Sequence, residues 1–196
     1  LPIEIKGASN AKPINYYESK GSAQCKSSIM LAALNTAGET IIKAKKSRDH
    51  TEILFRYLKI PISQKKNKNF DIIKIKGQKQ FSGFNYNIPS DISSSAFFIV
   101  LTLLSNKSKL IIKNVNINPS RIGVITILKK MGAKIYLKNK KSYMGEKNAD
   151  ILIKSSNEIK SISCPTKYNS QAIDEFLLIF LVAARAKGIS YFKDLS

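Results

Sequence analysis

Residues 91–105 read DISSSAFFIVLTLLS, a nearly all-apolar segment that is long enough for about four helical turns. A strand-like run, KLIIKNV, follows it at residues 109–115. A helix that is apolar on almost every side is buried on most of its faces. The same pairing of an apolar helix with a short strand is predicted in two other places, at Ser22–Ala37 with Thr40–Ala44 and at Gln171–Lys187 with Ile189–Lys193.

The segments between these pairs also repeat. Each gap holds one helix and then two strands: Asp49–Leu58, Ile62–Gln64 and Phe70–Lys76 in the first gap, and Ser120–Met131, Lys134–Leu137 and Asp150–Lys154 in the second. The unit helix–strand–helix–strand–strand therefore occurs twice, and a third copy stops after its first strand. Leu1–Lys6 is interpreted as the last strand of an earlier unit.

This pattern predicts an α/β (α+β) protein in which buried helices share an interior and Lys-rich strands lie outside. Residues 81–90 separate the first two units and contain Gly83, Asn85, Asn87 and Pro89. Such residues favour turns and connections, so we place the domain boundary between residues 88 and 89. The chain begins with Leu1 and stops just after a strand-like run, and we expect it to be part of a longer protein.

The composition excludes several classes of protein. The longest apolar runs, such as Phe176–Ala184, are near ten residues, whereas a membrane span needs about 20. Two cysteines, Cys25 and Cys164, do not make a disulfide framework. With His50 as the only histidine, a His/Cys metal site is nearly excluded, and no metal is predicted.

The net charge of +20 at first suggests a nucleic-acid-binding module. However, 29 of the 33 basic residues are lysines, and they are scattered over every segment. Nucleic-acid surfaces favour arginine, because its planar fork contacts phosphates and bases bidentately. A general bias of the sequence towards Lys, Ile and Asn is therefore the preferred explanation of the charge.

Two predicted helix starts could bind an anion. Ser22-Ala23-Gln24 opens the first apolar helix, where free N–H groups and the helix dipole favour negative charge. Ser47 and Arg48 precede the next helix, and a guanidinium group suits phosphate or carboxylate. The simpler alternatives are ordinary helix caps and surface side chains, and Lys26 is either a further anion contact or a solvated lysine.

Asp174 and Glu175 lie in the predicted first turn of the third apolar helix. A carboxylate in that position is stabilised by the helix dipole and needs no further function. Alternatively, an acid that points into a cleft could accept a proton from a hydroxyl group.

Several of these motifs occur in an order that resembles the EPSP synthase (3-phosphoshikimate 1-carboxyvinyltransferase) family of enolpyruvyl transferases. The resemblance covers essentially the whole chain. It rests on SAQCKS at residues 22–27, SRDHTE at 47–52, PSDISSSAFF at 89–98, NPSR at 118–121, MGA at 131–133 and IDE at 173–175.

The resemblance implies two similar lobes built from βαβαββ units with inward-facing helices. Residues 1–88 would be the last unit of the first lobe, and residues 89–196 the first unit and the start of the next in the second lobe. The implied reaction transfers the enolpyruvyl group of phosphoenolpyruvate to the 5-hydroxyl of shikimate 3-phosphate, without a cofactor. The implied enzyme is a cytoplasmic monomer with no nucleic-acid or membrane partner.

By the same resemblance, shikimate 3-phosphate would be bound by Ser22, Ala23, Gln24, Ser47 and Asp174. Asp174 would also be the catalytic residue that takes the hydroxyl proton, while Arg48 and Lys26 are possible anion contacts. The family's other basic residues, its Gly-rich segment and a catalytic Glu lie outside these 196 residues, so the chain alone is expected to be inactive. The alternatives are the related enzyme that acts on UDP-N-acetylglucosamine and the nucleic-acid-binding module.

Overall fold

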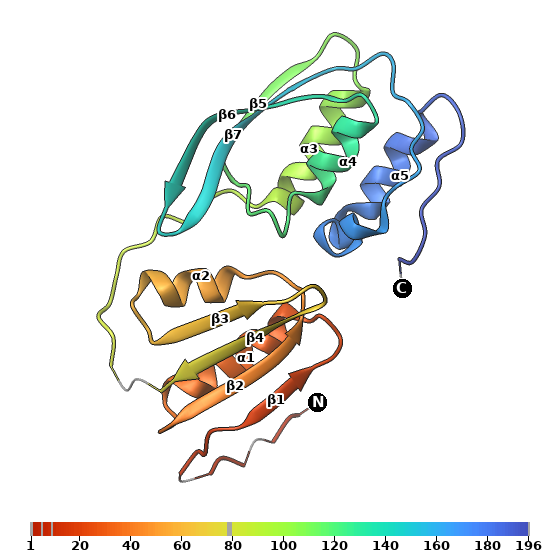
Figure 1. Cartoon of the computed structure of the whole chain (residues 1–196). Helices are drawn as coiled ribbons and strands as arrows, with labels where there is room; N and C mark the ends of the chain where they lie inside the picture. Colours follow the sequence, from red (N-terminus) through yellow and green to blue (C-terminus); the bar gives the residue numbers. More distant parts are fainter. Residues whose placement is uncertain (1, 5, 9, 78–79, 196) are drawn as a thin grey trace. The chain divides into compact units, whose positions relative to one another are not determined.

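The computed structural model describes residues 2–4, 6–8, 10–77 and 80–195, and these form two compact units, Leu1–Asn85 and Tyr86–Ser196. The division lies three residues before the predicted boundary. Unit 1 contains a four-stranded sheet in the order β1-β2-β4-β3 together with two helices (Figure 1). Its elements are β1 (Asn15–Glu18), α1 (Ala23–Leu34), β2 (Glu39–Lys45), α2 (His50–Tyr57), β3 (Ile62–Lys66) and β4 (Phe70–Lys76).

The residue alternation along the strands explains how unit 1 packs. In β2, Ile42 and Ala44 are buried whereas Lys43 and Lys45 are exposed, because successive side chains of a strand point to opposite faces. The apolar face packs against α1, with Met30 at 0% exposure near the centre of this core. The lysines of these strands therefore lie on the outer face, as predicted.

Unit 2 repeats this topology. Its elements are α3 (Ile92–Leu104), β5 (Lys109–Asn116), α4 (Gly123–Lys130), β6 (Lys134–Tyr143), β7 (Glu146–Lys154), the 3₁₀ helices η1 (Thr166–Gln171) and η2 (Ile173–Glu175), and α5 (Phe176–Ala184). The sheet order β5-β7-β6 corresponds to β2-β4-β3, and a parallel bridge from Ser90 to Val115 corresponds to the β1–β2 pairing. The predicted repeat is thereby confirmed.

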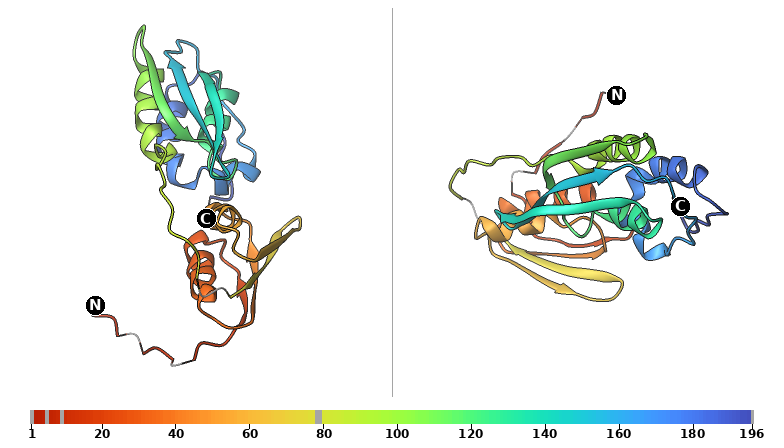
Figure 2. Two further views of the ribbon diagram at one scale, coloured as in Figure 1. Left: turned by 90° about the vertical axis from the view of Figure 1, so that its left-hand side faces the viewer. Right: turned by 90° about the horizontal axis from the view of Figure 1, so that it is seen from above.

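Helices α3 and α4 cover one face of the sheet of unit 2, and α5 packs against both helices (Figure 1). Figure 2 shows the same arrangement from the side, with the strands in front of the helices. A second hydrophobic core fills this space, and Ile99, Leu128 and Ile179 are fully buried in it. None of the helices in the described residues is long and apolar enough to cross a membrane.

Three predicted elements are wrong in extent. The described residues of Leu1–Lys6 form no strand, and Leu1 and Ile5 lie outside the described residues. The segment Ile189–Lys193 makes only one isolated parallel bridge, from Tyr191 to Ser163, and a second such bridge lies just before it at Lys187. The third apolar helix is also shorter than predicted, because η1 and η2 precede α5.

The prediction that the apolar helices are buried on most faces is also wrong for this chain. In α3, Phe97, Phe98 and Leu101 are about 60% exposed, and Leu177 of α5 is 80% exposed. Each helix buries the side that faces its own sheet or neighbouring helices. Within the described residues of each unit, nothing covers the opposite side.

Candidate functional site

The two predicted anion-binding loops of unit 1 follow neighbouring parallel strands. Glu18 at the end of β1 is in register with Ala44 of β2, so both strands end at the same edge of the sheet. The loop after β1 leads into α1, and the loop after β2 leads into α2. The sheet therefore brings the starts of both helices together. A Cβ atom built on Gly21 of the first loop would lie 3.6 Å from the carbonyl oxygen of Lys46 in the second.

The first loop is held by its own side chains. The buried Glu18 carboxylate accepts hydrogen bonds from the backbone N–H groups of Lys20 at 2.9 Å and Gly21 at 2.7 Å. Ser22 is the N-cap of α1, as predicted, because its Oγ accepts from Cys25 N at 3.2 Å. Ala23 and Gln24 form the first turn of α1, where backbone N–H groups have no partner within the helix.

The second loop contains Ser47 and Arg48, and both residues are half-buried. Ser47 Oγ is buried and has no hydrogen-bond partner among the described residues. A buried hydroxyl without a partner is uncommon and costs about 1–3 kcal/mol. Asp49 occupies the N-cap position of α2, but its side chain makes no capping hydrogen bond.

Lys26 is not the solvated lysine considered from the sequence. Its side chain is only 3% exposed, so it is not a solvated lysine. Its Nζ lies 2.7 Å from Glu52 Oε1 and donates to the carbonyl oxygen of Arg48 at 2.8 Å. The ammonium group therefore neutralises a buried carboxylate of α2, and its contact with a bound anion stays a prediction.

In unit 2, Asp174 is exposed and lies in η2, immediately before α5 and not in its first turn. The next residue, Glu175, is 3% exposed and accepts a hydrogen bond from Ser93 Oγ near the start of α3. Arg121 Nη2 in turn donates to Ser93 Oγ at 2.6 Å, and Arg121 Nη1 lies 3.1 Å from Asp91 Oδ1. Three separate sequence motifs thus meet next to Asp174.

Electrostatics stabilise the charged form of Asp91 in this cluster. Burial alone would raise the pKa of Asp91, but hydrogen bonds from Ser94 and the charge of Arg121 lower it below its ordinary value. Asp91 also caps α3, since its Oδ2 accepts from Ser94 N at 2.7 Å. The carboxylate of Asp91 therefore caps the start of α3 and pairs with Arg121 at the same time.

The repeat makes the two arginines equivalent. Ser47-Arg48 precedes the N-cap of α2, and Ser120-Arg121 precedes the N-cap of α4. By the same alignment of helix starts, Ser22 of α1 corresponds to Asp91 of α3. The second copy thus has a carboxylate where the first copy has a hydroxyl.

Sequence reasoning missed the burial and the partners of two residues. Glu52 and Glu175 were considered only as residues of predicted helix starts, although both side chains are buried. A charged residue at a position of a helix that faces the core would have been the signal for both. Among the described residues, no group of three or more His, Cys, Asp and Glu side chains could hold a metal ion.

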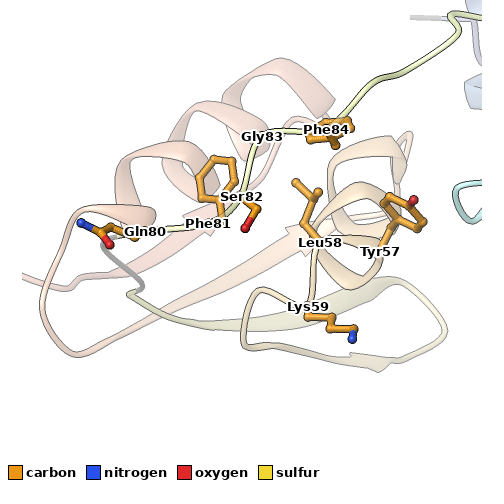
Figure 3. A pocket seen from close by; sticks show the side chains of 8 residues that line it. All are labelled: Tyr57, Leu58, Lys59, Gln80, Phe81, Ser82, Gly83 and Phe84. Atoms are coloured by element: carbon orange, nitrogen blue, oxygen red, sulfur yellow. The ribbon is translucent and has the colours of Figure 1, made fainter.

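A hollow of about 400 Å³ in unit 1 lies away from these loops, at the opposite end of α2. In Figure 3, Tyr57, Leu58 and Lys59 line one side of it and the chain from Gln80 to Phe84 lines the other. None of the residues predicted to bind substrate contributes to this hollow.

Comparisons with known proteins agree on one family. Residues 1–196 match the sequence model of a family described as EPSP synthase (3-phosphoshikimate 1-carboxyvinyltransferase). Proteins named 3-phosphoshikimate 1-carboxyvinyltransferase from Petrotoga mobilis and Ruthia magnifica are 40% and 43% identical over 195 residues. These matches cover 98% and 99% of this chain and 44% of each relative.

A solved structure of EPSP synthase from Acinetobacter baumannii superposes with a TM-score of 0.81 and 40% sequence identity. The superposition covers 94% of this chain and 41% of that structure. The chain therefore spans less than half the length of the proteins that it resembles.

Proposed function

Because this chain belongs to the EPSP synthase family, we propose that it forms part of an enzyme that makes 5-enolpyruvylshikimate 3-phosphate. In the proposed reaction, the 5-hydroxyl oxygen of shikimate 3-phosphate bonds to C2 of phosphoenolpyruvate while C3 gains a proton. Loss of phosphate and of a C3 proton from the tetrahedral intermediate then restores the enol double bond. The reaction needs no cofactor.

The geometry of the two loops in unit 1 carries this proposal. Ser22 Oγ, the backbone of Ala23 and Ser47 Oγ are proposed to bind the phosphate of shikimate 3-phosphate, and Gln24 its ring. The unpaired Ser47 hydroxyl supports this assignment, because a phosphate oxygen would supply the acceptor that it lacks. The start of α1 adds free N–H groups and the positive end of the helix dipole.

The second copy of the repeat supports an anion-binding role for Arg48. Its equivalent, Arg121, pairs with the carboxylate of Asp91 at a helix start. The corresponding position in the first copy is Ser22, which has no charge. A phosphate bound there would take the place that the carboxylate has in the second copy.

Asp174 is proposed to be the general base that accepts the proton of the attacking hydroxyl, and also to bind the hydroxyl groups of shikimate. Its exposure leaves the carboxylate accessible to a substrate. Its neighbour Glu175 accepts a hydrogen bond from Ser93 Oγ, which in turn accepts one from Arg121, so the backbone that carries Asp174 is anchored on α3 and, through Ser93, linked to the loop before α4.

The proposal extends to the organisation of the whole enzyme. Unit 1 would be the last repeat of one lobe, and unit 2 the start of the other lobe. The complete enzyme is proposed to be a cytoplasmic monomer.

Two substitutions in the full-length enzyme test these roles. Asp174→Ala should lower kcat by roughly 10²-fold or more, since a general base contributes about that much. Ser47→Ala should mainly raise KM for shikimate 3-phosphate by roughly tenfold or more, because a hydrogen bond to a charged group contributes about 1.5–3 kcal/mol. Phosphate release from phosphoenolpyruvate is the assay, and Ser142→Ala on the exposed part of β6 is the control.

Small and equal effects of both substitutions would mean that these residues are only structural. Turnover of UDP-N-acetylglucosamine in place of shikimate 3-phosphate would instead identify the related enolpyruvyl transferase.

A further inference from the structure

The most deeply buried charges of unit 1 form a pair between its two helices. The side chains of Lys26 and Glu52 are 3% and 0% exposed, and Nζ lies 2.7 Å from Oε1. Charges are rarely buried in a protein unless each has a partner, because removing them from water is costly. The position of this pair therefore calls for an explanation beyond the packing of a core.

The pair fastens the two proposed phosphate-binding loops to each other. Lys26 lies one turn after Ser22 in α1, and its Nζ also donates to the carbonyl oxygen of Arg48 in the second loop at 2.8 Å. Glu52 lies in the first turn of α2. Beside this pair, the hydroxyl groups of Ser27 and Thr51 are 2.7 Å apart and share a hydrogen bond.

We propose that Lys26 and Glu52 are positioning residues, which fix the spacing between the Ser22–Gln24 segment and Ser47–Arg48 and so set the affinity for the phosphorylated substrate. We call this pair, with the Arg48 carbonyl, the loop latch. Neither side chain is proposed to touch the substrate, because Lys26 and Glu52 are only 3% and 0% exposed. This inference rests on the proposed function of the two loops.

The second copy of the repeat shows why the latch uses these residues. The same connection in unit 2 is made by Arg121, which reaches Asp91 and Ser93 at the start of α3. The positions that correspond to Lys26 and Glu52 are Ser95 and Ile125, which form no ion pair.

In unit 2 the connection therefore places the carboxylate of Asp91 directly at the start of α3, where it would repel a phosphate. The loop latch instead uses the carboxylate of Glu52 in the first turn of α2. This carboxylate pairs with the ammonium group of Lys26, one turn after the start of α1. The latch joins the same two segments and leaves the start of α1 to an uncharged serine, which is the arrangement that an external anion requires.

The experiment separates positioning from folding with a double substitution in the full-length enzyme. Lys26→Met alone would leave Glu52 charged and unpaired, and the protein would unfold too readily for a clear result. Replacing both partners by apolar residues of similar size, as in Lys26→Met with Glu52→Leu, is often neutral for stability. We expect the urea midpoint to stay at or above the wild-type value.

In the same double variant, KM for shikimate 3-phosphate should rise about tenfold while kcat changes less than about twofold, because only the binding loops are released. The matched control is the exposed pair Lys74 and Glu39, whose Nζ and Oε1 atoms are 3.6 Å apart in the same unit. Lys74→Gln with Glu39→Gln should change neither KM nor the urea midpoint. A stable double latch variant with unchanged KM, or with a lowered kcat alone, would overturn the proposal.

Two further measurements keep the test decisive. If the double variant does not fold, Glu52→Gln keeps the Lys26–Arg48 contact and should raise KM by about threefold; an unchanged KM overturns the proposal. If the wild-type enzyme does not use shikimate 3-phosphate, the proposed function fails by itself. Hydrogen exchange of the amides at residues 47–50 then measures whether the latch holds the second loop. Faster exchange in the double variant supports the positioning role of Lys26 and Glu52, and unchanged exchange refutes it.

Discussion

Replacing Ser22 by Asp would place a carboxylate at the start of α1, as Asp91 does at the start of α3 in the second copy of the repeat. Aspartate is as good an N-cap as serine, and Asp91 already shows the corresponding capping bond to Ser94 N at 2.7 Å. The free energy of unfolding of unit 1 should therefore be unchanged or slightly higher. The new carboxylate, however, would stand where we propose that the phosphate of the substrate binds.

The size of the effect follows from Coulomb's law. Two unit charges about 4 Å apart repel by about 1 kcal/mol in water and by about 4 kcal/mol at an effective dielectric constant of about 20. A dianionic phosphate doubles these values, and Ser22 is half-buried, so at least about 2 kcal/mol of binding should be lost. Ser22→Asp should thus weaken binding of shikimate 3-phosphate by about 30-fold or more.

Calorimetric titration of the full-length enzyme with shikimate 3-phosphate measures this change, and raising the salt concentration should reduce it. Ser22→Asn is the matched control, because it keeps a good cap without the charge. Equal affinity of the aspartate and asparagine variants would refute the placement of the phosphate at the start of α1.

Three further predictions concern unit 2, and native-state hydrogen exchange of its amides can measure each of them separately from unit 1. Glu175→Ala should destabilise unit 2 by about 2–3 kcal/mol, since it leaves the Ser93 hydroxyl, which itself accepts from Arg121, without its buried charged acceptor; a loss below about 0.5 kcal/mol, as expected for the exposed Glu158, would contradict this. Because the pKa of Asp91 is lowered from its ordinary value of 3.8, its carboxylate stabilises unit 2 at pH values above 3.8. This stabilisation should disappear as the pH falls through the lowered pKa. Asp91→Asn should therefore show a flatter acid dependence than the wild type, and identical pH profiles would argue against the ion pair. Gly123→Ala should destabilise unit 2 by about 1–3 kcal/mol, because the new Cβ would lie 2.7 Å from the backbone of η1; unchanged protection of α4 would show that η1 can move aside.

The sequence was sufficient for elements with a strong local signal. The bounds of β4 are those predicted, and Ser22 caps its helix as expected. By contrast, β6 extends to Tyr143, six residues beyond the prediction, because its polar second half is fixed by pairing with β7 and not by an apolar pattern. Strand β1 was missed because its four residues have no apolar alternation.

The side-chain clusters could not be predicted because they depend on distant partners. Ser93 and Glu175 are 82 positions apart, and only the packing of η2 on α3 brings them together. Lys26 was interpreted from its residue type, which usually lies in water. Its burial becomes understandable only with Glu52 and the Arg48 carbonyl in place.

The two copies of the repeat differ in which carboxylate pairs with a basic side chain near the helix starts. In unit 2, Arg121 is paired with a carboxylate of the protein itself, so the helix start has no need of an external anion. In unit 1 the carboxylate is instead that of Glu52, which pairs with Lys26 and lies away from the start of α1. The same backbone topology therefore gives a closed ion pair in one copy and a proposed phosphate site in the other, and the difference depends on a few side chains at equivalent positions.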